Sequence, residues 1–234
     1  MRFEQPLIEG TLLRRRQRFQ ADIKLRCGDE VTAHCAHNGN MTGCSEPGSR
    51  VLLSVHADPR RRFRHQIEIV YAGRTPVGIH AGRPSDVLFE AMVQGKITEL
   101  AGYAQVHRGG RPRKLSHVDL LLDGNGLRPC HISTRSVTLA YDRVAYFPDA
   151  VLPRAPQELS ELTDLVREGS RAVIFLLVQR ADVEGFRPAD HIDAEFGQTF
   201  RDAVARGVEV LCYRAKIGRK GIELDRRLPV DLGL

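Results

Sequence analysis

Residues 117–140 read HVDLLLDGNGLRPCHISTRSVTLA, and this stretch indicates the architecture of the second half of the chain. It holds two runs with strand character, and residues 123–126 (DGNG) between them are a strong hairpin signal. We therefore predict two antiparallel strands over 117–122 and 127–134. A single acid, Asp119, lies in the first strand, where burying an unpaired carboxylate is costly. An ion pair, exposure at the strand end or a bound metal ion would satisfy it.

The segments around this hairpin alternate between helical and strand patterns. A helix is predicted to begin at Pro84-Ser85-Asp86, with Ser85 or Asp86 as its cap, and amphipathic helices are predicted over 157–168 and 191–206. The run 172–178 (AVIFLLV) is apolar throughout, which is typical of a strand buried on both faces, and 208–213 predicts another strand. Elements in this order indicate an α/β sandwich over residues 81–234.

The first 80 residues have a different pattern. Short, partly alternating runs separated by Gly, Pro and Asp predict strands over 7–13, 18–26, 30–36, 51–56 and 65–71. Five short strands in succession suit a small Greek-key barrel of the OB type. We therefore predict a two-domain protein of mixed α/β (α+β) class, in which an OB-like five-stranded β-barrel over residues 1–80 precedes the sandwich.

The positive charge is concentrated in the first of these domains. The chain of 234 residues carries a net charge of +6, and residues 1–80 hold 13 Lys+Arg and 8 Asp+Glu, whereas residues 81–234 hold 22 and 21. A basic first domain points to an anionic polymer as the partner. Arginine far outnumbers lysine, which suits bidentate phosphate contacts but is equally expected from genome composition.

Composition also bears on the compartment. The sequence contains no run of 18 apolar residues and no apolar region typical of a signal peptide, so we expect a cytoplasmic protein with no membrane contact. Five scattered cysteines without a CxxC pair are typical of reduced thiols. A zinc site formed by His34, Cys35, His37 and Cys44 is an alternative, although its spacing departs from the usual ligand patterns.

Two arginine-rich runs in the first domain are candidates for contact with DNA phosphates. On a strand, alternation places Arg14, Arg16 and Arg18 on one face, with Phe19 nearby to stack on a base. The alternative is a solvated edge strand whose charges prevent aggregation. Together with a weaker loop cluster, the candidate DNA contacts are Arg14, Arg15, Arg16, Arg18, Phe19, Arg60, Arg61, Arg62, Arg64, Arg111, Arg113 and Lys114.

Several motifs, taken together and in this order, are specific to one family. They are RFQAD (18–22), GNMTG (39–43), ELAGY (99–103), SVTLA (136–140), YFPDAV (146–151), GSRAVIF (169–175) and HID (191–193). On these motifs the chain resembles the sugar fermentation stimulation protein A family over almost its whole length. The resemblance implies an OB-like N-terminal domain, a C-terminal domain of the PD-(D/E)XK nuclease class, and sequence-nonspecific DNA binding with a suggested link to sugar metabolism.

The nuclease motif implied by this resemblance is altered in the chain. In that class an Asp and a Glu on successive strands hold a divalent metal, and a Lys two residues after the Glu assists the reaction. The resemblance places Asp119 on the first acid, but Ser133 stands where the family has Glu and Arg135 where it has Lys. Serine is a poor ligand for a hard cation, and arginine cannot act as a base. The barrel loop at 36–39 and the segment around Arg154 also depart from the family pattern.

These observations lead to one hypothesis and two alternatives. We expect a sequence-nonspecific DNA-binding protein, whose degenerate nuclease-like domain holds the phosphate backbone with Arg135 and Arg154. The first alternative is an active nuclease that uses Mg²⁺ or Mn²⁺ held by Asp119, Glu99 and Asp149. The second is an interaction scaffold without a nucleic-acid role. The sequence leaves open the choice between DNA and RNA and the oligomeric state, including a homodimer.

Overall fold

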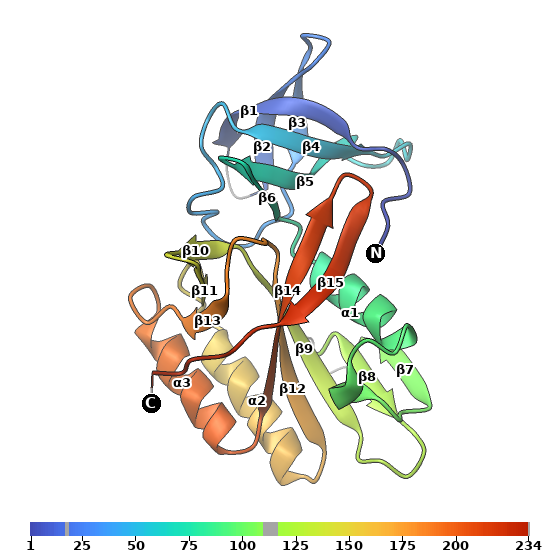
Figure 1. The fold of residues 1–234 in the computed structure, drawn as a ribbon, viewed down its shortest axis with the longest axis vertical. Coiled ribbons are helices and arrows are strands. Elements are labelled where there is room, and N and C mark those ends of the chain that lie inside the picture. The colour runs from blue at the N-terminus through green and yellow to red at the C-terminus, as the bar shows by residue number, and fades with distance from the viewer. Residues whose placement is uncertain (17–18, 110–116, 234) are drawn as a thin grey trace.

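The computed structural model describes residues 1–16, 19–109 and 117–233, and it has two parts that adjoin where β6 ends and α1 begins (Figure 1). The first part is a sheet of strand order β3-β2-β1-β4-β5-β6, in which β3 also pairs with β5 and closes a barrel. Its strands are β1 (Ile8–Arg16), β2 (Gln20–Leu25), β3 (Glu30–His34), β4 (Arg50–Val55), β5 (His65–Ala72) and β6 (Thr75–Gly78). The expected five-stranded barrel is therefore confirmed, and β6 is an additional strand that the sequence pattern did not predict.

The second part is built on a six-stranded sheet of order β15-β14-β12-β9-β8-β7. Its strands are β7 (Gln105–Arg108), β8 (Leu120–Asp123), β9 (Cys130–Val137), β12 (Arg171–Val178), β14 (Glu209–Gly218) and β15 (Gly221–Arg227). A small second sheet combines β10 (Leu139–Tyr141), β11 (Val144–Phe147) and β13 (Gly185–Pro188). A short 3₁₀ helix, η1 (Thr98–Leu100), precedes β7.

Helices cover both faces of the large sheet. Helix α1 (Arg83–Val93) packs on one face, and α2 (Ala155–Arg167) and α3 (Ala194–Ala205) pack on the other (Figure 1). Strand β12 runs parallel to both β9 and β14, and its side chains alternate between the two faces. Val173, Phe175 and Leu177 join the core under α1, whereas Ala172, Ile174 and Leu176 join the core under α2 and α3. The apolar run 172–178 is thus the central strand of an α/β sandwich, as predicted.

Several element boundaries differ from the sequence-based expectation. Strand β8 begins at Leu120, so that Asp119 lies just before it, and β9 extends to Val137. Helix α1 begins after Gly82 and has no side-chain cap, because Ser85 donates its hydroxyl to the Gly82 carbonyl instead. Helix α3 begins three residues later than expected, because Asp193 caps it by accepting a hydrogen bond from the Phe196 amide at 2.9 Å.

The barrel and the sandwich share one hydrophobic cluster. Leu52 and Ile69 of the barrel pack with Val87 of α1 and with Ile217 and Ile222 of the β14–β15 hairpin. Figure 1 shows this hairpin reaching from the sandwich to the barrel beside β6. Burial of apolar area across this contact stabilises the relative placement of the two parts. None of the helices in the described ranges is long and apolar enough to cross a membrane.

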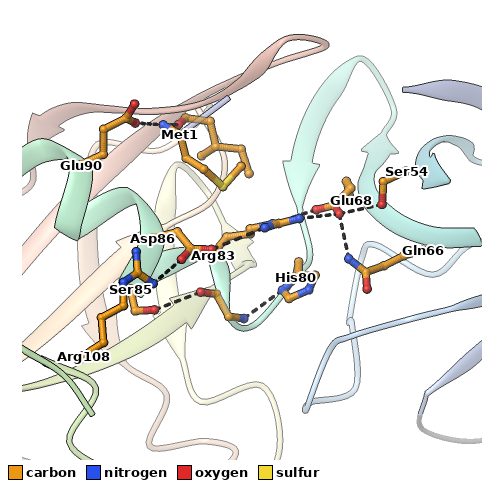
Figure 2. A network of polar contacts seen from close by, with 12 residues as sticks. Met1, Ser54, Gln66, Glu68, His80, Arg83, Ser85, Asp86, Glu90 and Arg108 are labelled. Atoms are coloured by element: carbon orange, nitrogen blue, oxygen red, sulfur yellow. Dashed lines mark hydrogen bonds and ion pairs between the residues drawn. The ribbon is translucent and has the colours of Figure 1, made fainter. Parts of the chain in front are cut away.

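A buried ion pair also crosses the contact (Figure 2). Glu68 on β5 is fully buried, and its carboxylate accepts hydrogen bonds from Arg83 of α1 at 2.6 and 3.0 Å. Ser54 and Gln66 of the barrel donate to the same carboxylate at 3.0 and 2.8 Å. Burial raises the pKa of Glu68, but the hydrogen bonds and the charge of Arg83 outweigh it and hold that pKa below its ordinary value.

We predict that Glu68→Gln destabilises the protein by about 3 kcal/mol, because it removes the charge closest to the partly buried Arg83 guanidinium and leaves it only the longer contact with Asp86 at 3.4 Å. The matched control is Glu184→Gln, which removes an exposed carboxylate from its pair with Arg143 and should cost less than about 1 kcal/mol. Urea unfolding of both variants measures the difference. An equal effect of the two substitutions would contradict this role for the buried pair.

The same pair makes stability depend on acid pH. Because folding lowers the pKa of Glu68 from its ordinary value of 4.5, the stability gained is fully present above pH 4.5. It is lost as the pH falls through the lower pKa of the folded state. Unfolding curves of the wild type should therefore converge on those of Glu68→Gln in acid, and a constant difference at all pH values would contradict the assignment.

Candidate nucleic-acid interface

A hollow on the barrel surface joins the second arginine-rich run of the sequence to Phe19, which follows the first run. This barrel groove has a volume of about 760 Å³. It is lined by Phe19, Gln20, His34, Arg61, Arg62, Phe63 and Gln66. Side chains from β2, β3 and β5 form its floor, and residues 61–63 of the β4–β5 connection form a wall. Residues far apart in sequence thus meet because β3 pairs with both β2 and β5.

The barrel groove combines positive charge with aromatic surface. None of its lining residues is acidic, and within the described ranges no ion pair joins Arg61 or Arg62 to a carboxylate. The Arg62 guanidinium lies over the Phe63 ring, 5.1 Å from its centroid, and the rings of Phe19 and His34 are 6.5 Å apart. Phe19 is 45% exposed, although burial of a ring of this size is strongly favourable. Uncompensated arginines beside open rings suit an anionic ligand that carries planar groups.

A second hollow lies between the barrel and the sandwich. This interdomain cleft has a volume of about 680 Å³ and shares Phe19 with the barrel groove. The barrel contributes Phe19, the loop 37–39 and Ala81. The sandwich contributes residues 134–136 of β9, residues 147–149 after β11, and residues 151–155 with Glu158 at the start of α2. Residues 134–136 of β9 and the barrel loop therefore line one cleft.

The barrel loop docks on the sandwich through Asp149. The Asp149 carboxylate accepts a hydrogen bond from the Met41 amide at 3.0 Å and lies 3.7 Å from His37 Nε2. His37 Nε2 is also 3.1 Å from the Thr138 hydroxyl, and its Nδ1 accepts from the Gly39 amide. A Cβ atom at Gly39 would stand only 1.6 Å from Asp149 Oδ1, so only glycine allows this approach.

Asp119 is satisfied without a metal ion. Its Oδ2 accepts hydrogen bonds from the main-chain amide and the hydroxyl of Thr134, at 2.6 and 2.8 Å. Ser133 is fully buried, and its hydroxyl donates to the His117 carbonyl at 2.8 Å. Arg135 pairs with Glu158 of α2 at 2.7 Å. One carboxylate, a buried hydroxyl and a guanidinium do not make a divalent-metal site, so these residues do not fit the metal that the nuclease class would hold.

The structure does not group the carboxylates proposed for the alternative metal site. Glu99 of η1 accepts hydrogen bonds from the Tyr213 hydroxyl and pairs with Arg227 at 3.0 Å, whereas Asp149 holds the barrel loop. Burial and the adjacent Glu99 carboxylate raise the pKa of Tyr213 to about 12. Within residues 1–16, 19–109 and 117–233 no three His, Cys, Asp or Glu side chains could hold a metal together. This corrects the set Asp119, Glu99 and Asp149, and likewise the zinc site, because Cys35 and Cys44 pack in the barrel core.

The structure separates the predicted DNA contacts into different roles. Arg14 and Arg16 lie on one side of β1, as alternation predicts, and both pair with Asp22, at 2.8 and 2.5 Å. Arg15 instead donates to the carbonyls of Gly39 and Asn40, at 2.9 Å each. Arg15 therefore holds the barrel loop, because the alternation that aligns its neighbours turns it the other way, and its assignment as a DNA contact stays a prediction.

The remaining arginines of the prediction also differ in their surroundings. Arg60 is bound to its neighbour Asp58 through two nitrogen atoms, at 3.0 and 3.1 Å, which neutralises it. Arg61 and Arg62 line the barrel groove, and Arg64, two residues further along the chain, is exposed. Arg154 is exposed and lines the cleft. The candidates Arg18, Arg111, Arg113 and Lys114 lie outside the described residues. Sequence reasoning missed Gln66, and it named His34 and Asp149 only as candidate metal ligands, because nothing in the local sequence shows that they line a groove or hold the barrel loop.

Comparison with known proteins shows similarity to one family over almost the whole chain. The family model described as the SfsA N-terminal OB domain matches residues 13–79, and the one described as the sugar fermentation stimulation protein RE domain matches residues 82–221. The chain belongs to the SfsA family. A sugar fermentation stimulation protein homolog from Geobacter sp. (strain M21) is 48% identical over 234 residues, which cover 99% of this chain and 100% of the relative. A homolog from Citrifermentans bemidjiense has the same identity and coverage.

The fold of the SfsA family is also seen in a solved structure. The structure of Pyrococcus furiosus SfsA in complex with Ca²⁺ superposes with a TM-score of 0.88 and covers 99% of this chain and 98% of the other. The two sequences are 23% identical, so the likeness shows the shared fold. The expected resemblance to the SfsA family and the mixed α/β fold with an OB-like barrel are thus confirmed.

We predict that Gly39→Ala destabilises the docking of the barrel loop by about 1–3 kcal/mol, because its methyl group would overlap the Asp149 carboxylate. Asp149→Ala should also be destabilising, because it leaves the Met41 amide without its partner. The double variant should lose clearly less free energy of unfolding than the sum of the two single losses, because removal of the carboxylate also removes the clash. Urea unfolding of the four proteins tests this, and strict additivity would contradict the contact.

Proposed function

We propose that this SfsA-family protein binds DNA without sequence preference, through contacts between arginine guanidinium groups and phosphates. The observation that carries the proposal is the barrel groove, in which Arg61 and Arg62 stand beside open aromatic rings and no lining residue is acidic. The concentration of positive charge in residues 1–80 supports it, since such a surface attracts a polyanion at long range. Contacts between guanidinium groups and phosphates carry no sequence information, which supports the absence of sequence preference.

We further propose that residues 81–234 form a degenerate nuclease-like domain of the PD-(D/E)XK class, and that residues 1–80 are the main binding module. Support comes from Asp119 at the start of β8, with Ser133 and Arg135 on the adjacent β9. In this arrangement Arg135 and Arg154 would hold backbone phosphates at the cleft without metal-dependent cleavage of the DNA. The free state of all five cysteines supports a reducing compartment such as the cytoplasm.

The binding proposal predicts a steep dependence on salt. As the salt concentration rises, affinity for oligonucleotides of unrelated sequence should fall to the same extent. The double variant Arg61→Ala/Arg62→Ala should lower the steepness of log affinity against log salt by about one per lost phosphate contact. The matched control is Arg60→Ala, because Asp58 already neutralises that arginine. Fluorescence anisotropy of labelled oligonucleotides measures both. No binding even at low salt would overturn the proposal and favour a scaffold role.

The degenerate-site proposal predicts that Mn²⁺ neither raises the Tm of the wild type nor supports plasmid nicking. Ser133→Glu/Arg135→Lys should bind Mn²⁺, because it restores a second carboxylate next to Asp119. Adding Asp119→Ala to that double variant should abolish the Tm shift. Nicking by the wild type that Asp119→Ala removes would establish the active nuclease instead. In that case Glu158, which lines the cleft and pairs with Arg135, would be the first candidate to test as a second metal-binding carboxylate.

A further inference from the structure

We infer that the DNA bound by this protein is single-stranded, and that one strand runs from the barrel groove across Phe19 into the interdomain cleft. The inference rests on the proposed function and names the form of its ligand. Its first support is continuity, because Phe19 lines both hollows. A chain-like ligand that occupies the groove would therefore reach the cleft past this ring.

The exposure of Phe19 is the second support. All nine phenylalanines lie in the described ranges, and Phe19 is the only one whose side chain is exposed. It directly precedes β2, and its main-chain carbonyl accepts a hydrogen bond from the Cys35 amide at 3.0 Å, which fixes its backbone against the next strand. Val151, which is 62% exposed, lines the cleft beyond it. Apolar surface left open at two points along one path is typical of a binding surface.

The chemistry of the groove selects an unpaired strand. In a duplex the faces of the bases are stacked on one another, so a protein ring cannot cover them without unstacking the helix. In a single strand each base has an open face, and aromatic side chains stack on it whatever the sequence. Phe19 offers such a face, while Arg61 and Arg62 line the same groove and would hold the phosphates. Stacking without edge-reading also agrees with binding that is indifferent to sequence.

The interdomain cleft would hold the next part of the strand. Arg154 is exposed there, and no ion pair joins it to a carboxylate in the described part of the chain. The adjoining Arg135 is bound by Glu158 and is less available. The strand would therefore be held by Arg154 at its far end and by the groove at its near end, with Phe19 between the two.

The experiment uses the fact that the protein contains no tryptophan. Phe19→Trp makes a single-tryptophan protein in which a stacked base quenches the indole fluorescence. Leu127→Trp is the matched control, because Leu127 is 44% exposed and lines neither hollow. Each protein is titrated with a single-stranded thymidine oligomer, a duplex of mixed sequence and inorganic polyphosphate, which has the charge but no bases.

We expect the thymidine oligomer to quench Phe19→Trp, in parallel with binding measured by anisotropy, and to leave Leu127→Trp unchanged. Polyphosphate should displace the oligomer without quenching. In addition, Phe19→Ala should weaken single-strand binding about 5- to 150-fold and change duplex binding less than about twofold. Because Phe19 is exposed, the Tm of this variant should equal that of the wild type, which separates lost stacking from lost folding.

The dependence of affinity on oligomer length tests the path into the cleft. Affinity should increase with oligomer length until the strand spans both hollows, and Arg154→Ala should remove the gain of the longer oligomers while leaving the shorter ones unchanged. Salt-dependent binding in which Phe19→Trp is not quenched and duplex binds as well as single strands would overturn this inference and leave the proposed function intact. If no nucleic acid binds at low salt, the proposed function itself fails.

Discussion

The buried pair between Glu68 and Arg83 is the constraint on which the arrangement of this protein depends. A carboxylate with no solvent exposure must have its charge matched, and the residue that matches it comes from the first turn of α1 in the other part of the molecule (Figure 2). Two main-chain hydrogen bonds lie close to this pair. The Ile79 amide donates to the Glu68 carbonyl within the barrel, and the Gly78 amide donates to the Gln179 carbonyl of the sandwich. The barrel therefore meets the sandwich in one orientation, which the shared hydrophobic cluster stabilises.

This orientation creates the interdomain cleft. With β5 fixed against α1, the barrel loop at 37–41 reaches the segment after β11, where Asp149 receives it. Gly39 permits the approach, and Arg15 holds the loop from the barrel side. The cleft is thus a product of the contact between the parts rather than of either part alone. Its mouth opens at Phe19, where it joins the barrel groove.

The polar groups at and beside the sandwich side of the cleft satisfy one another. Asp119 accepts two hydrogen bonds from Thr134, and Ser133 turns its hydroxyl to a main-chain carbonyl, so each group that would face a cation is satisfied by the protein. Arg135 is likewise neutralised by Glu158. A charge-satisfied surface of this kind needs no ion for stability.

The sequence by itself determined the order and type of the main elements. The DGNG turn, the apolar run at 172–178 and the alternating runs before residue 80 are local patterns, and local backbone preference suffices to predict them. Strands such as β6, β10 and β13 escaped prediction because they are short, and their pairing is set by distant partners. The chemical character of Ser133 and Arg135 also follows from the sequence, because residue type alone decides whether a side chain can bind a cation.

Only the tertiary structure decided which polar residues act together. Sequence alternation aligned Arg14 with Arg16, but it could not show that both would meet Asp22 or that Arg15 would bind the barrel loop. It likewise could not bring Phe19 beside residues 61–63, because that proximity follows from the closure of the barrel by β3 and β5. Charge pairing and cleft formation depend on distances through space, and these are fixed only when the barrel closes and docks on α1.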